Sequence, residues 1–435
     1  MTIRFIHFGD THLSRTYPYP VSFERVSAFN KAFQHVIDKA LELDVDFIIH
    51  AGDLFDRLNP WPSVVAFVKS QIAKLEEARI PLFIIRGNHD GSFDSEGVLR
   101  GCSIELLKHP SFTTLHFVDP VYDLMRESLR DTPGYRDYLE SIRIIGIGYF
   151  GHHIGKYFER YVHNALRTDK DAYILVLHTF VEGYTACPPG EPYIPLSYIE
   201  SLPLTYIAVG HDHDARDPLR LRNGAIIACS GSTEKWDFYE SDGKFFYLVE
   251  LKGDNVARIS KHAIPSPHIM TALVVESDTP RSPDWFVKEA IRRITELANS
   301  TSKKLILRIR FKGELRAGNL SDIPLHLIEK AVKRLRSSGK LLYCEITPPD
   351  LTVRLEDIKV KPEGLDIKSA FLEALKDPAL AEKAYQIFDY ARELYRDEDN
   401  LTRDGNLKES AMRRLKDKIS SLWGVSYSPL GPGLL

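Results

Sequence analysis

Short apolar runs rich in β-branched residues alternate with amphipathic helical patterns along the first 265 residues. IRFIHF is followed by a helical pattern near residues 23–43, DFIIHAG by a second near 62–78, and PLFIIRG comes next. Strands that alternate with helices favour an α/β domain with parallel strands, because each helix carries the chain back across one face of the sheet. In such sheets ligands bind just beyond the carboxyl ends of the strands, so polar residues at those ends are candidate site residues.

More strand-like runs follow in the same part of the chain. They are IRIIGIGYF (142–150), AYILVLHTF (172–180), LTYIAVGHDH (204–213), AIIACSGS (225–232) and KFFYLVEL (244–251). The last two are spaced like neighbouring strands of a meander. So many strands predict a mixed sheet or two sheets.

The pattern changes after Pro265. Three apolar runs and two amphipathic helices then make a βαβαβ module, and beyond Pro348 and Pro349 the chain reads as helices with apolar positions at i, i+3 and i+4. The 435 residues also exceed what one hydrophobic core usually fills. We therefore expect three parts, residues 1–265, 266–350 and 351–435.

Composition excludes several classes of protein. No stretch approaches the ~20 apolar residues of a membrane span, and the N-terminus enters a strand-like run without a secretory leader. Four widely spaced cysteines form no CxxC pair, which argues against a disulfide framework or a structural zinc site. A net charge of −3 means that any contact with nucleic acid must come from local basic patches. These features predict a cytoplasmic protein outside the membrane.

Metal-ligating side chains follow five separate strand-like runs. One such motif is more often a turn or a helix cap, but five in order are not readily explained as independent coincidences. Carboxylates, imidazoles and an amide suit divalent transition ions, and two ions ~3.5–4 Å apart need a bridging carboxylate. The motifs are FGDTHL with Asp10 and His12, AGDLFDR with Asp53, Asp56 and Arg57, RGNHD with Asn88, His89 and Asp90, LVLHTF with His178, and AVGHDHD with His211 and His213.

The order DxH, GDxxDR, GNHD, H and GHxH resembles the calcineurin-like metallophosphoesterase superfamily over residues 8–213. Two further stretches, GDLFDRLNPWPS (52–63) and GSTEKWDF (231–238), resemble the SbcD-type nuclease subunits of prokaryotic DNA double-strand-break repair complexes. The resemblance implies an α/β fold: a two-sheet metallophosphoesterase sandwich flanked by helices, with a small α/β capping domain and a C-terminal helical segment.

The resemblance also implies roles for the motif residues. Seven of them would hold two divalent ions, most often Mn²⁺, although the ligand types exclude neither iron nor zinc. His89 would stay off the metals and contact the scissile phosphate or protonate the leaving oxygen, while Gly87 makes the turn before it. The implied ligands are Asp10, His12 and His213 for one ion and Asn88, His178 and His211 for the other, with Asp53 as the bridge.

One position departs from many relatives. Asp56 stands where many archaeal and eukaryotic members carry a histidine that is thought to position DNA for exonuclease cutting. An aspartate there is expected to orient a metal ligand or Arg57, which leaves cleavage polarity and the balance of exonuclease to endonuclease activity open. Asp90 is expected to brace its loop through backbone hydrogen bonds.

Several other residues admit two interpretations. His152 and His153 fit an exposed surface pair better than a metal pair, and His50 fits a core or supporting histidine better than a ligand. The basic helix carrying Lys330, Lys333, Arg334 and Arg336 is either a solvated face or a DNA phosphate-binding patch. The C-terminal helices pack on their own domain or, as the resemblance favours, dock onto an SMC-like coiled-coil ATPase. Residues 94–109, with an apolar helical face, either pack on their own core or, as the resemblance favours, form a homodimer contact.

The sequence thus leads to a metal-dependent DNA nuclease, exonuclease or endonuclease. It would process double-strand-break ends for repair as a homodimer with an SMC-like ATPase, in the cytoplasm at the nucleoid. Two other interpretations stay open. One is a metal-dependent phosphoesterase acting on nucleotides or other small phosphoesters, since fold and metals alone do not choose a substrate. The other is a structural subunit that binds DNA ends with weak catalysis.

Overall fold

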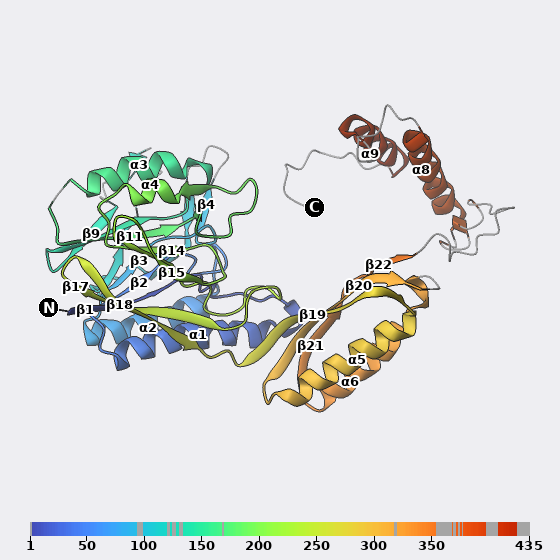
Figure 1. The fold of residues 1–435 in the computed structure, drawn as a ribbon, viewed down its shortest axis with the longest axis horizontal. Coiled ribbons are helices and arrows are strands. Elements are labelled where there is room, and N and C mark those ends of the chain that lie inside the picture. Colours follow the sequence, from blue (N-terminus) through green and yellow to red (C-terminus); the bar gives the residue numbers. More distant parts are fainter. Residues whose placement is uncertain are drawn as a thin grey trace. The chain divides into compact units, whose positions relative to one another are not determined.

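Figure 1 shows the fold of the chain in a computed structural model. The structure describes residues 2–93, 99–119, 122–123, 128–129, 134–167, 169–316, 320–353, 368, 371–372, 375, 377–396 and 408–423. The chain divides into two compact units, Met1–Thr352 and Val353–Leu435.

One six-stranded sheet carries the first three motif loops. Its order is β18-β17-β1-β2-β3-β6, and α1 (Ser22–Glu42) and α2 (Pro62–Ala78) pack their apolar faces on it. Four strands of this sheet run parallel to one another, namely β1, β2, β3 and β6. Their carboxyl ends therefore lie at one edge. The strands are β1 (Thr2–Phe8), β2 (Phe47–His50), β3 (Leu82–Ile84), β6 (Leu115–Phe117), β17 (Lys244–Lys252) and β18 (Asn255–Ile264).

A second six-stranded sheet carries the remaining motifs. Its order is β15-β16-β14-β11-β10-β9, with α3 (Ile154–Ala165) and α4 (Leu196–Glu200) on its outer face. A buried core that includes Phe5, Phe47 and Val176 fills the space between the two sheets. The predicted two-sheet sandwich flanked by helices is confirmed. The strands are β9 (Tyr135–Tyr138), β10 (Ile142–Ile147), β11 (Ala172–His178), β14 (Tyr206–Gly210), β15 (Arg216–Arg220) and β16 (Ile226–Cys229).

The meander predicted for residues 225–251 is wrong. β16 lies between β14 and β15 in the second sheet, whereas β17 belongs to the first sheet and pairs with β1 and β18. The connection of residues 230–243 is long enough to cross from one sheet to the other, which the spacing of two apolar runs does not reveal. This crossing brings Trp236 and Glu240 to the motif loops.

Residues 268–353 add a smaller α/β layer within the first unit. The parallel strands β19 (His268–Arg281), β20 (Lys304–Leu315) and β21 (Leu341–Ile346) form its sheet, and β22 (Asp350–Val353) pairs with β20. The helices α5 (Pro283–Ser300) and α6 (Leu325–Ser337) contact each other and the sheet (Figure 1). We call this layer the cap.

The second unit is helical in its described part. α8 (Pro378–Arg396) packs against α9 (Glu409–Trp423), and Leu394 and Ala411 are buried between them. Leu372, Leu375 and Phe388 remain exposed on this unit. None of the helices in the described ranges has the length and apolar character needed to cross a membrane.

Within residues 94–109, the described part is not one helix. It forms β5 (Leu99–Cys102), which pairs with β4 (Gly91–Phe93), and the 3₁₀ helix η2 (Ser103–Leu107), while residues 94–98 lie outside the described part. The predicted helical face is therefore wrong for 99–102, whereas the 3₁₀ helix buries Ile104 and Leu107 in the core beside the first sheet. The remaining short elements are η1 (Tyr19–Val21), β7 (Tyr122–Asp123), β8 (Ser128–Leu129), η3 (Gly151–His153), β12 (Phe180–Glu182), β13 (Tyr193–Pro195) and η4 (Leu320–Asp322).

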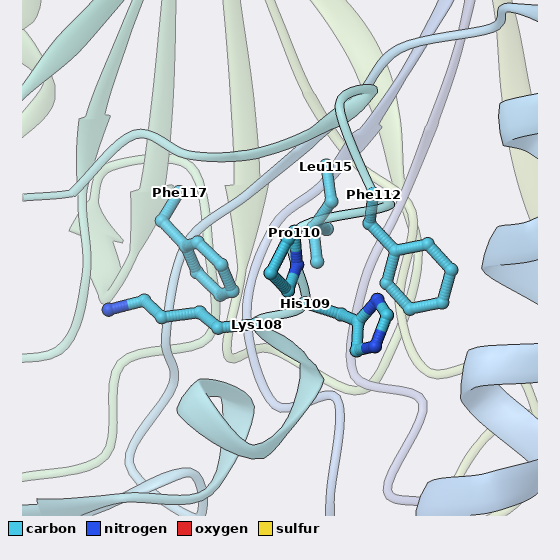
Figure 2. Close-up of a pocket in the computed structure, with 6 residues that line it drawn as sticks. All are labelled: Lys108, His109, Pro110, Phe112, Leu115 and Phe117. Atoms are coloured by element: carbon cyan, nitrogen blue, oxygen red, sulfur yellow. The ribbon is translucent and has the colours of Figure 1, made fainter.

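An open pocket of about 400 Å³ lies beside the β6 edge of the first sheet (Figure 2). Lys108 places its ammonium 5.3 Å from the centre of the Phe117 ring, and the rings of His109 and Phe112 lie side by side. None of the candidate ligands lines this pocket, so it is separate from the site described next.

Candidate metal centre

All seven predicted ligands lie together where strands of both sheets end. The loop after β1 supplies Asp10 and His12, and the loops after β2 and β3 supply Asp53 and Asn88. The second sheet supplies His178 at the end of β11 and His211 and His213 just after β14. The site therefore depends on the sandwich, because neither sheet alone carries the whole set.

The first group of candidate ligands is Asp10, His12 and His213. Their ligand atoms lie within 4.8 Å of one another. The Nε2 atoms of His12 and His213 are 3.0 Å apart, and His213 Nε2 is 4.0 Å from Asp10 Oδ1. Two imidazole nitrogens and a carboxylate oxygen thus converge on one point.

The second group is Asn88, His178 and His211. Asn88 Oδ1 lies 3.1 Å from both His178 Nε2 and His211 Nδ1. Asp53 stands between the two groups, because its Oδ2 is 3.6 Å from His12 Nε2 and 3.4 Å from His178 Nε2. One carboxylate oxygen facing both groups has the geometry of a bridging ligand.

Hydrogen bonds orient these rings. His178 Nδ1 donates to the carbonyl of Ala51 over 2.8 Å, which directs Nε2 into the centre. His213 Nδ1 is held 2.8 Å from the Glu240 carboxylate, with the same effect. The other Glu240 oxygen accepts from Ser232, the Trp236 amide and Lys244, so this carboxylate is itself fixed. Partners of this kind raise ligand basicity and set ring orientation.

Charge in the centre is balanced between carboxylates and imidazoles. Burial opposes ionisation of Asp53, but His178 and His12 hold its pKa well below the usual value. Burial likewise opposes charge on His178, but Asp53 overrides it and raises the pKa of His178 to about 9. Burial raises the pKa of Asp10 to about 6 against the influence of His178 and His213. Asp53 and His178 therefore each favour the charged form of the other.

The backbone at the centre adopts rarely populated conformations. Asp10, His12, Asp53 and His211 have positive φ angles of 49°, 41°, 51° and 81°. Such residues cost of order 1–3 kcal/mol each and cluster at functional sites. Their occurrence at four of the seven candidate ligands supports a functional role for the loops.

Gly87 is required by space and not by the turn that was predicted for it. A Cβ atom on Gly87 would lie 2.0 Å from Asp53 Oδ1, and its φ is not in the left-handed region. Gly52 has φ +95°, and a Cβ there would lie 2.3 Å from His178 Nδ1. These two glycines let the loops approach the ligands closely.

His89 borders the centre and remains 28% exposed. Its Nδ1 lies 3.0 Å from the backbone oxygen of Asp56, and because that oxygen only accepts, Nδ1 must carry the proton. Its amide N–H donates to Asp53 Oδ1 over 2.8 Å. The ring is thus held by its Nδ1 side, and Nε2 lies on the opposite side of the ring.

The three supporting residues from the sequence have separate partners. Asp56 lies 3.4 Å from His12 Nδ1 and 3.6 Å from Arg15, so it contacts a candidate ligand. Arg57 instead donates to the Ser14 carbonyl and the Thr16 hydroxyl. Asp90 is buried and accepts from the amides of Leu54, Phe55 and Gly87, which braces two motif loops.

Three further residues lie at the centre that the sequence motifs do not predict, namely Arg15, Trp236 and Glu240. The Trp236 ring centre lies 5.5–6.0 Å from the rings of His12, His89 and His213, and the Arg15 guanidinium lies 3.5 Å from it. Arg15 follows His12 by three residues and Trp236 lies within GSTEKWDF, so both stood beside quoted motifs. The sequence around Arg15 and Trp236 does not show which residues their side chains contact.

The remaining candidates lie outside the centre. His50 is buried and bonds to the Thr11 hydroxyl at 2.8 Å, whereas His152 and His153 are exposed on η3. The cap helix α6 carries the four predicted DNA-binding cations. Three of them line an open depression of about 590 Å³, namely Lys330, Lys333 and Arg334, and Arg336 lies in the last turn of the same helix.

Residues 3–215 match the Calcineurin-like phosphoesterase family. This part of the chain belongs to that family. We call residues 3–215 the phosphoesterase domain. It contains the motif loops of both sheets and all seven candidate ligands. Members of the family use divalent metals, and the domain has Asp and His side chains grouped to hold them.

Curated relatives match well beyond the phosphoesterase domain. The DNA double-strand break repair protein Mre11 of Thermoplasma acidophilum is 26% identical over 403 residues, which cover 89% of this chain and 94% of that protein. The proteins of the same name from Sulfurisphaera tokodaii and Archaeoglobus fulgidus are 28% and 25% identical and cover 76% and 88% of this chain and 77% and 83% of their own lengths.

The residues of the phosphoesterase domain fit divalent cations. His12 Nδ1 faces the Asp56 carboxylate at 3.4 Å and His211 Nε2 is buried without a hydrogen-bond partner, while the opposite nitrogens of the two rings face the other candidate ligands. Nitrogen and oxygen atoms 3.0–3.1 Å apart around shared points are the arrangement expected of ligands to common ions.

Proposed function

We propose that the chain is a metal-dependent DNA nuclease that processes DNA double-strand-break ends. The observation that carries the proposal is the set of seven converging nitrogen and oxygen ligands, beside which His89 is held through its Nδ1. Relatives named as DNA double-strand break repair proteins, matching 76–89% of the chain, supply the choice of DNA as substrate.

Asp10, His12 and His213 would hold one divalent cation and Asn88, His178 and His211 the other, with Asp53 shared. Bound there, two cations, which we propose to be Mn²⁺, would neutralise charge on the phosphoryl oxygens and lower the pKa of an attacking water. The chain's own part is to keep these ligands oriented. Ala51 and Glu240 do so for His178 and His213.

His89 is the proposed catalytic residue. When both ring nitrogens carry protons, Nδ1–H is donated to the Asp56 carbonyl and the second proton lies on Nε2. That proton can be donated to the phosphate or to the departing 3′ oxygen, where negative charge develops. Asp56 acts as a positioning residue, since its backbone oxygen holds His89 and its carboxylate lies 3.4 Å from His12 Nδ1.

The test is hydrolysis by purified protein with Mn²⁺ of a labelled DNA duplex, single-stranded DNA and p-nitrophenyl phosphoesters. We expect DNA cleavage that His89→Ala and Asp53→Ala abolish and that the matched surface variant His152→Ala retains. His89→Ala should still bind cations, whereas Asp53→Ala should bind fewer. Hydrolysis of small phosphomonoesters alone would favour a small-molecule phosphoesterase, and DNA binding without cleavage would favour a structural subunit.

Contacts beyond the centre are part of the same proposal. Lys330, Lys333, Arg334 and Arg336 would contact DNA phosphates without reading sequence. The exposed Leu372, Leu375 and Phe388 of the C-terminal unit suit an apolar groove on an SMC-like coiled-coil ATPase. A homodimer at the nucleoid completes the arrangement, with residues 94–109 as its candidate contact.

A further inference from the structure

Aromatic rings and guanidinium groups alternate from the candidate metal centre to the cap. The Arg15 guanidinium lies 3.5 Å from the Trp236 ring centre and 5.3 Å from that of Tyr17. The Arg308 guanidinium of the cap lies 5.9 Å from Tyr17 and 5.5 Å from Tyr239. We call the six residues Trp236, Arg15, Tyr17, Arg308, Tyr239 and Arg310 the stacking path.

The path is fixed in place by contacts that cross from the rest of the first unit to the cap. Arg308 donates to the Tyr17 hydroxyl and to Glu345. Arg310 donates to the Tyr239 hydroxyl over 3.3 Å. Both arginines lie on β20, whereas Tyr17 and Tyr239 lie on loops outside the cap. These contacts therefore hold the rings in place where the cap meets the rest of the first unit. We call this boundary the seam.

The outer rings of this region face solvent. Tyr239 is 53% exposed, and Tyr19, next to the path, is 74% exposed. The rings of Tyr19 and Tyr17 are nearly perpendicular, with an interplanar angle of 86°, so they do not stack face to face. Exposed rings of this size are costly to leave in water and are enriched where proteins bind partners.

Carboxylates accompany the guanidinium groups. Asp56 lies 3.6 Å from Arg15, Asp237 lies 3.5 Å from Arg308, and Asp350 lies 4.0 Å from Arg310. The path therefore has little net positive charge to attract a phosphate backbone. What it offers instead is a series of flat π surfaces, which suits bases that are not already stacked in a duplex.

We propose that the stacking path binds the unpaired bases of a single DNA strand as it leaves the metal centre across the seam to the cap. The proposal rests on the proposed nuclease function and specifies how that site receives its substrate. It makes stacking at Tyr239, and at Tyr19 next to the path, the source of affinity, in contrast to the phosphate contacts proposed for Lys330 and its neighbours on α6.

The test measures binding of fluorescein-labelled (dT)15 and of a blunt duplex by fluorescence anisotropy. EDTA is present so that no DNA is cleaved. Tyr239→Ala and Tyr19→Ala should each weaken binding of (dT)15 by about 10-fold. The affinity ratio to wild type should be the same at every salt concentration, since no phosphate contact is lost. Tyr239→Phe keeps the ring and loses the bond from Arg310, so it should bind (dT)15 more tightly than Tyr239→Ala does.

The matched control is Tyr193→Ala, which removes an exposed tyrosine of β13 outside the path and should bind (dT)15 as wild type does. Thermal unfolding of each variant reports whether its fold is intact. Unchanged (dT)15 binding by folded Tyr239→Ala would overturn the stacking path, as would an equal loss of duplex binding. If that variant binds normally while wild type still cleaves DNA, only the path fails; if wild type cleaves no DNA, the proposed function fails.

Discussion

Trp236 donates its indole N–H to the carboxylate of Asp56 over 2.9 Å. This bond joins the loop after β2 to the crossing between the sheets. Asp56 in turn lies 3.4 Å from His12 Nδ1, so a residue outside the motifs reaches a candidate ligand through a single carboxylate.

Trp236→Phe keeps an aromatic ring and removes the donor. Asp56 then loses a buried hydrogen bond, and we expect a loss of ~1 kcal/mol in the free energy of unfolding. We also expect slower hydrolysis of bis-p-nitrophenyl phosphate, because Asp56 no longer fixes His12. Urea denaturation and steady-state kinetics check the two effects. Wild-type kinetics in the variant would show that the bond does not position the centre.

Asp53→Asn tests the bridge between the two ligand groups. The amide keeps the size of the side chain but loses the charge that balances His178 and faces both groups. We expect Mn²⁺ bound per chain, measured by equilibrium dialysis, to fall from two to at most one. Asp254→Asn in an exposed turn is the control. Two tightly bound ions in Asp53→Asn would contradict a shared carboxylate.

Glu240 should affect metal affinity without touching the metal. Glu240→Ala removes the partner of His213 Nδ1, and outer partners of this kind typically contribute about 10–100-fold to metal affinity. Glu240→Gln retains an acceptor and should lose less. Competition with a chelator gives both affinities. Equal affinity in wild type and Glu240→Ala would mean that His213 needs no such support.

Glu76 provides a pH-dependent test of the fold. The hydroxyl of Thr113 and the hydroxyl and amide of Thr114 donate to its carboxylate and lower the pKa of Glu76 to about 2, from a usual 4.5. A lowered pKa stabilises the fold above pH 4.5, and this contribution is lost as pH falls toward 2. Glu76→Gln should therefore lower the Tm at pH 7, and the difference should shrink below pH 4.5.

The matched control for Glu76 is Glu77→Gln, which changes the exposed neighbouring residue. Its Tm should follow that of wild type across the same range. A constant gap between Glu76→Gln and wild type from pH 7 to pH 3 would contradict the assigned cause.

Removal of residues 353–435 tests the proposed role of the C-terminal unit. Met1–Thr352 is a compact unit that contains every candidate ligand, so hydrolysis of bis-p-nitrophenyl phosphate should continue at the rate of the full chain. Co-elution with the SMC-like ATPase in size-exclusion chromatography should be lost. Retention of the complex by the truncated chain would place the ATPase contact elsewhere.

The sequence by itself determined the strands that end in motifs, and through them the candidate ligands. This was possible because a parallel strand places the residue after its last apolar position at the sheet edge, whatever the rest of the chain does. Asp10, Asp53 and His178 could be chosen from local pattern alone. The cap strands could be read in the same way, since apolar runs such as KKLILRIRF carry their own periodicity.

Only the tertiary structure decided how those elements combine. β16 belongs to the second sheet and β17 to the first, against the expectation of a meander. Strand pairing depends on which edge of a sheet is open and not on the spacing of strands along the chain. The crossing between the two sheets sets Trp236 over three histidines and Glu240 against His213. From the sequence alone, Gly87 is predicted to make a turn. In the structure it is required because the carboxylate of Asp53, 34 residues earlier, occupies the space that a Cβ atom on residue 87 would take. Local periodicity specifies the individual strands and helices. Contacts between loops far apart in the sequence depend on how those elements pack, and the pattern of a single strand holds no information about that packing.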